Sequence, residues 1–158
     1  MKSFLALVTA ISFAAFLTAV PTARAKIPDD QIKSAGAIEL TTELLDKMDN
    51  AAKAVHGDEA ARTEMAGVKE TEPDLWAAAV DSKCPKASAH LKEAGITADE
   101  LMKGTLAIMA CMMDEKGDLA NSDNETAKAN AEFVKENKDR CDKVGGAVMG
   151  MGEAAAAK

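Results

Sequence analysis

The chain has 158 residues and a formal net charge of −7, and aromatic residues make up only 3% of it. This acidity argues against nucleic acid and anionic lipid as partners, because phosphate binding needs clustered lysine and arginine side chains. Alanine, glutamate, lysine, leucine and methionine are abundant and favour helices, whereas the residues that favour strands are scarce. The composition and length therefore predict one all-α domain with a thin core of closely packed helices.

Residues 1–25 have the pattern of a secretory signal peptide. Lys2 supplies a positive charge, residues 4–20 form an uncharged apolar run, and Ala-Arg-Ala at 23–25 presents small residues where signal peptidase cleaves. An uncleaved anchor is the alternative, but the run is at the lower length limit for crossing a bilayer. We expect cleavage before Lys26 and a protein in the periplasm or outside the cell, with no membrane association afterwards.

Residues 26–145 are predicted to form a small helical bundle. A long first helix is expected from Asp29 to Gly57, because apolar residues recur along it at spacings of three and four. A weaker helical stretch follows over 58–70. Two short helices come next, the first capped by Thr71 and interrupted at Cys84-Pro85, the second covering 87–94.

Two capping-box patterns predict the starts of the last two helices. Thr97 and Glu100 precede an apolar helix that we expect in the core, and residues 122–125 repeat the pattern. The last helix is expected to end at Gly145-Gly146, so that the two helices form a C-terminal antiparallel hairpin around Gly117. Residues 146–158 carry no caps and are expected to form a flexible Gly/Met/Ala tail.

The three cysteines are Cys84, Cys111 and Cys141, and in an exported protein a disulfide is the usual state of such residues. In a continuous hairpin of helices 98–116 and 123–144, Cys141 would lie roughly 20 Å from Cys111 at about 1.5 Å rise per residue. A disulfide needs Cα atoms within about 7 Å. We therefore expect a Cys84–Cys141 bridge and a buried free thiol at Cys111, with a reactive or intermolecular thiol there as the alternative.

Methionine and histidine side chains are the candidate ligands for a metal or haem. Thioethers suit Cu(I). Buried methionines also fill gaps between alanines, which is the alternative explanation for their number. Core packing does not explain the Met-Gly-Met sequence at 149–151. Neither histidine occurs in a Cys-x-x-Cys-His or Glu-x-x-His pattern, but a haem between one His and one Met stays open. The candidates are Met109, Met112, Met113, Met149, Met151, His56 and His90.

Two further patterns have a plain structural interpretation. Residues 114–125 have the length of an EF-hand loop, but Leu119 stands where that loop needs glycine, which favours an ordinary turn between helices. Asn130 and Asn137 lie on the apolar stripe of the last helix, where a buried amide generally forms hydrogen bonds across a helix interface rather than binding a ligand.

The C-terminal part of the chain resembles a family of uncharacterised exported bacterial helical proteins. The resemblance is carried by Ile-Thr-Ala-Asp-Glu-Leu at 96–101 and Asn-Ala-Glu-Phe-Val-Lys-Glu-Asn at 130–137. These match an Ile/Leu-Thr-x-x-Asp/Glu start to a buried helix and an Asn-x-x-Phe-Val-x-x-Asn-like last helix. The resemblance implies export and a helical fold, and it brings no activity.

The sequence contains no nucleophile–base pair, paired-carboxylate site or glycine-rich phosphate loop, so we expect no enzyme. The leading expectation is an exported helical protein without a cofactor that binds another protein or a small apolar ligand. A periplasmic copper or haem carrier that uses Met, His or Cys ligands is the alternative.

Overall fold

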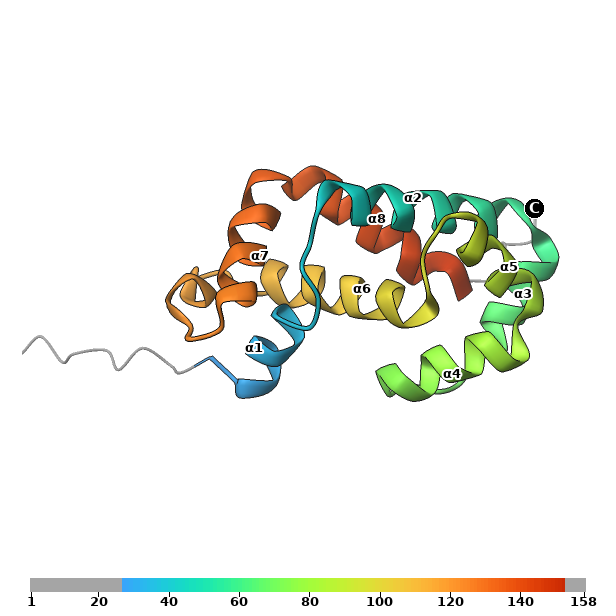
Figure 1. Cartoon of the computed structure of the whole chain (residues 1–158), viewed down its shortest axis with the longest axis horizontal. Helices are drawn as coiled ribbons and strands as arrows, with labels where there is room; N and C mark the ends of the chain where they lie inside the picture. Colours follow the sequence, from blue (N-terminus) through green and yellow to red (C-terminus); the bar gives the residue numbers. More distant parts are fainter. Residues whose placement is uncertain (1–26, 153–158) are drawn as a thin grey trace, which may run out of the picture.

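The computed structural model describes residues 27–152 (Figure 1) and confirms the all-α prediction, since this part of the chain contains helices and no strand. The segment predicted as a signal peptide lies outside the described residues. None of the described helices is long and apolar enough to cross a membrane. The helices are α1 (Asp29–Ala35), α2 (Thr42–Gly57), α3 (Glu59–Ala66), α4 (Pro73–Lys83), α5 (Pro85–Glu93), α6 (Ala98–Met112), α7 (Glu125–Glu136) and α8 (Lys138–Met149), with two short 3₁₀ helices, η1 (Asp118–Asn121) and η2 (Gly150–Gly152).

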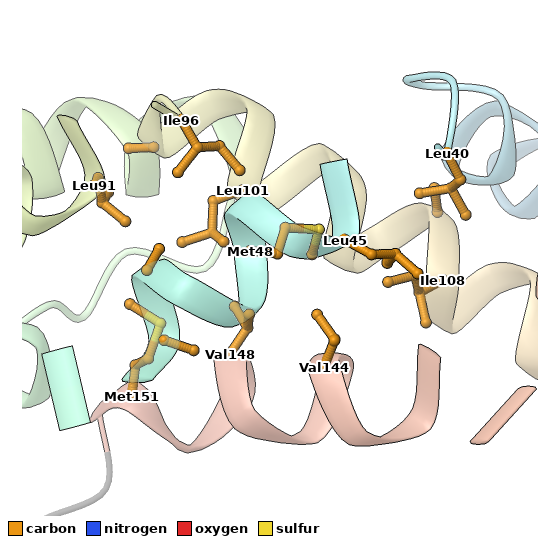
Figure 2. Packing of buried hydrophobic residues seen from close by; sticks show 14 of the residues in the cluster. Leu40, Leu45, Met48, Leu91, Ile96, Leu101, Ile108, Val144, Val148 and Met151 are labelled. Carbon is orange, nitrogen blue, oxygen red and sulfur yellow. The ribbon is translucent and has the colours of Figure 1, made fainter. Parts of the chain in front are cut away.

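Helix α6 is the centre of the molecule, and α1, α4, α7 and α8 all pack on it. Its capping box forms as predicted: the Thr97 hydroxyl accepts from the backbone N–H of Glu100, and the Glu100 carboxylate accepts from that of Thr97 at 2.9 Å. Leu101 and Ile108 are fully buried, and Figure 2 shows them among side chains of α2 and α8. The prediction of a core helix is confirmed.

The prediction of a single first helix over 29–57 is wrong, because the chain breaks after Ala35 and restarts as α2. The amide of Asn130, on α7, satisfies the backbone at this break. Its oxygen accepts from the Leu40 N–H at 2.8 Å, and its nitrogen donates to the carbonyls of Ala35 and Ile38, both at 2.7 Å. A buried break is stable only when such backbone groups find partners, and here one side chain supplies all three.

The expected last helix is divided at Asn137, whose side chain donates to the Phe133 carbonyl at 2.9 Å where α7 ends. After this division α8 runs along α6 in the opposite direction (Figure 2), with Val144 near Ile108 and Val148 nearer Leu101. The antiparallel partner of α6 is therefore α8, and not one continuous helix over 123–144.

The chain remains helical beyond Gly145-Gly146, and α8 continues to Met149. Met151 in η2 is only 1% exposed, and the ring nitrogen Nε2 of His56 lies 2.8 Å from the Ala147 carbonyl oxygen. The expectation of a flexible tail is therefore wrong for residues 146–152, because this segment packs on α2, α3 and α6. Residues 153–158 lie outside the described part of the chain.

Candidate functional site

A pocket of about 420 Å³ opens between α3, α4, α6 and the end of α8. This volume lies within the usual range for small-molecule sites. We call it the methionine pocket, because four of its lining residues are methionines. The lining residues are Met65, Ala66, Val68, Trp76, Met102, Thr105, Leu106, Met109, Val148 and Met149.

Helix α6 contributes to the core and to the pocket from different faces. Residues 102, 105, 106 and 109 recur at three- and four-residue spacing and line the pocket, so they share one face of the helix. Leu101 and Ile108 belong to the face that packs on α2 and α8 (Figure 2). The helix is apolar nearly all round because both faces are covered by other parts of the fold.

The methionine pocket is uncharged. None of the described residues that line it carries an ionisable side chain. The one hydroxyl, on Thr105, donates its proton to the Leu101 carbonyl at 2.7 Å, so it can offer a ligand only an acceptor. Trp76 adds a flat aromatic face. The lining is therefore suited to an apolar molecule and offers no partner for a ligand charge.

Two of the five candidate methionines come together in the methionine pocket. Met109 and Met149 line the methionine pocket, whereas Met151 is buried in the core and Met113 is 71% exposed. Met112 lines a separate pocket beside Cys111. Met65 and Met102 also line this pocket, and neither was among the candidates identified from the sequence. The seven-residue spacing of Met102 and Met109 could have placed those two on one face, but no local signal connects Met65 on α3 with α6.

Neither histidine lines the methionine pocket. The Nε2 atom of His90 lies 3.1 Å from an Asp58 carboxylate oxygen, and this hydrogen bond lowers the pKa of Asp58. Asp58 also caps α3 by accepting from the N–H groups of Ala60 and Ala61. His56 is held by the carbonyl of Ala147. Within the described residues, no group of three His, Cys, Asp or Glu side chains is placed to hold a metal.

The structure holds no Cys84–Cys141 disulfide, and Cys84, Cys111 and Cys141 are all free and buried. The prediction is wrong because it assumed a continuous last helix. Figure 1 shows the α4–α5 junction, where Cys84 lies, at the right end of the molecule, whereas α8, which holds Cys141, begins well away from it beside the start of α2. Burial raises the pKa of all three thiols, and that of Cys111 reaches about 12.

The segment 114–125 is built as a turn. Both carboxylate oxygens of Asp114 accept backbone hydrogen bonds, one from Asp118 at 2.9 Å and one from Leu119 at 2.8 Å. Leu119 is fully buried. Asp114 therefore holds η1 in place, as the interpretation of an ordinary turn expected.

Comparison of the chain with protein-family models, with curated proteins and with solved structures finds no match. The candidate site must therefore be interpreted from its own geometry.

Proposed function

We propose that this protein is an exported binding protein whose methionine pocket holds a small, uncharged, apolar ligand. The observation that carries the proposal is a preformed pocket of about 420 Å³ whose described lining residues include no charged side chain. A concave site of this size, lined mainly by apolar and aromatic side chains with few polar groups, has the composition usual for small-molecule sites. The absence of an ionisable group from the described lining also favours binding over acid–base or nucleophilic catalysis.

The lining favours adaptable recognition. Methionine side chains are unbranched and polarisable, so they can repack around ligands of different shape. Met149 is 61% exposed at the end of α8 and can move without disturbing the core. Trp76, the only tryptophan of the chain, lies in the lining and serves as an intrinsic reporter of binding.

The test is a titration with a neutral apolar dye, N-phenylnaphthylamine, followed by dye fluorescence and by energy transfer from Trp76. We expect saturable binding that is lost in Leu106→Asp, because this change places a charge in the lining. Leu75→Asp is the matched control, since Leu75 is exposed on α4 beside Trp76 and lies outside the lining. Equal loss in both variants, or no saturable binding, would contradict the proposal.

A Cu(I) carrier is the second candidate, favoured by the convergence of four thioethers from α3, α6 and α8 on one pocket. Ag(I) is a suitable probe because it binds soft ligands without changing its oxidation state. The double variant Met102→Leu, Met109→Leu removes two sulfurs and retains apolar volume. If the site is a metal site, Ag(I) binding falls and dye binding persists. If it binds apolar ligands only, Ag(I) affinity is low and unchanged in the variant.

Export is part of the proposal and rests on the sequence pattern of residues 1–25. The intact mass of the protein recovered from the periplasm or the medium tests it, and we expect a chain that begins at Lys26. A product that retains residues 1–25 would show that the segment is an anchor rather than a cleaved signal.

A further inference from the structure

The register of α6 and α8 gives Cys111 and Cys141 facing positions on the two packed helices. A Cβ atom on Gly145 would lie 3.6 Å from Cγ2 of Ile108, which fixes where the two helices meet. In an antiparallel pair, a step of one turn towards the end of α6 corresponds to a step of one turn towards the start of α8. From Ile108 and Gly145, this step leads to Cys111 and Cys141.

Both cysteines lie on the faces that the helices turn towards each other. Cys111 follows Ile108 by three residues, and Cys141 precedes Val144 by three and Gly145 by four, so each shares a face with those contacts. Cys141 is fully buried and Cys111 is 8% exposed. A negative charge on Cys141 also raises the pKa of Cys111, as expected of two sulfurs that are close.

Gly145 allows the two helices to approach closely. It is buried and has no side chain to separate α8 from Ile108. Packed helices have axes about 8–10 Å apart, and facing residues of a close pair then come near the Cα separation of about 4.4–6.8 Å that a disulfide requires.

We propose that Cys111 and Cys141 form a redox pair that a disulfide oxidant, such as oxidised glutathione or a protein disulfide, converts to an intramolecular bridge. Once the pocket beside it has formed, Cys111 is the more accessible of the two thiols, because it lines an open pocket that also includes Asp114, Lys135 and Lys138. Cys141 is the resolving thiol, reached only from within the fold.

The bridge forms in two thiol–disulfide exchange steps. The Cys111 thiol loses its proton, and its sulfur attacks the oxidant disulfide, so that a mixed disulfide forms and one thiol is released. The Cys141 thiol then loses its proton, and its sulfur attacks the Cys111 sulfur, which releases the second thiol and leaves the Cys111–Cys141 bond. The protein gives up two electrons and two protons, and the oxidant takes them up.

Only a small fraction of either thiol is ionised in the folded protein, because burial raises their pKa, and thiolates are the reactive species. Oxidation is therefore expected to be fastest while the chain folds and slow in the folded, reduced protein. The finished bridge is shielded from reductants in the same way. These properties are those of a structural bridge formed once in an oxidising compartment, rather than of a catalytic dithiol.

The test is to refold the reduced protein in a glutathione redox buffer, block free thiols, and map peptides without reduction. We expect one Cys111–Cys141 bridge, a loss of two hydrogens from the intact mass, and a blocked Cys84. The bridge should raise the melting temperature by roughly 10 °C over the reduced protein.

Variants separate the roles of the three cysteines. Cys84→Ala should form the bridge as the wild type does, and Cys141→Ala should stop at the mixed disulfide of Cys111. A bridge that includes Cys84, or three blocked thiols in the refolded wild type, would overturn the proposal. The wild-type map decides the matter by itself if a variant fails to fold.

Discussion

Asn130 shows how one buried side chain can set the course of a backbone 90 residues away. Its amide oxygen accepts one hydrogen bond and its amide nitrogen donates two, all with backbone groups at the break between α1 and α2. The sequence predicted a hydrogen-bonding role for this residue from its place on an apolar stripe. It could not predict the partners, because Leu40, Ala35 and Ile38 are distant in the chain and carry no local pattern that points to α7.

We predict that Asn130→Ala lowers the free energy of unfolding by about 3 kcal/mol, because it leaves two buried backbone groups and one partly buried carbonyl without their partner. Urea denaturation followed by circular dichroism measures this loss. Asn137→Ala is the control, since Asn137 forms one hydrogen bond within its own helix turn, and about 1 kcal/mol is expected for it. Equal losses would mean that Asn130 does not stabilise the break.

The buried Cys111 thiol predicts a pH dependence of the reduced protein. Its pKa is raised from 9.0 to about 12, mainly by burial and also by the charges of Asp114 and Cys141. The unfolded chain therefore loses this proton at lower pH than the folded chain. The stabilising effect is complete below pH 9 and is lost as the pH rises towards 12.

Denaturation of the reduced protein from neutral to alkaline pH tests this dependence. Between about pH 8 and pH 11, the fall in the free energy of unfolding should be smaller in Cys111→Ala than in the wild type by about 1–3 kcal/mol. The two proteins are compared by how much their free energy of unfolding changes with pH and not by its absolute value, because replacing a buried cysteine by alanine also lowers the stability on its own. Parallel curves for the two proteins would contradict a buried, protonated thiol at this position.

At the scale of helices, local signals and tertiary contacts determine different features. The start of α6 at the capping box and the end of α2 at Gly57 follow from a few neighbouring residues, and both were predicted. The breaks before α2 and at Asn137 depend on packing between distant segments, and both were missed. The second omission also produced the wrong disulfide, because the direction of α8 decides which cysteine Cys141 can meet.

Gly36, which follows α1, and Gly146, within α8, should respond oppositely to replacement by alanine: the first change should lower the stability and the second should raise it. A Cβ atom on Gly36 would lie 2.4 Å from Nδ2 of Asn124, and the oxygen of that amide caps α7 by accepting from the Ala127 N–H. Gly36→Ala should therefore cost about 1–2 kcal/mol through the displaced cap. Gly146 is exposed within α8 and has open space around its Cα, so Gly146→Ala should gain up to about 1 kcal/mol. Thermal denaturation of both variants checks the two signs.

For the whole molecule, the composition and periodicity predicted an all-α fold around one apolar helix, and the structure confirms both features in the described residues. The methionine pocket was beyond this reasoning, because Met65, Trp76, Met102 and Met149 come from four helices that no spacing relates. The sequence contains more methionines than core packing explained, namely the two of the Met-Gly-Met sequence at 149–151. The structure divides that surplus: Met149 lines the pocket, and Met151 closes the core against α2 and α3.

The Met149-Gly150-Met151 sequence thus combines a pocket-lining residue and a core residue, and exchanging each in turn should separate the two properties. Met151 is 1% exposed, so Met151→Ala should lower the free energy of unfolding by about 2–4 kcal/mol through lost burial and the cavity left behind. Met149 is mostly exposed and lines the pocket. Met149→Ala should therefore leave the urea midpoint within experimental error and weaken binding of the neutral dye severalfold. If Met149→Ala destabilised the fold as much as Met151→Ala, or if it left dye binding unchanged, Met149 would be a packing residue and the pocket would lose its rim.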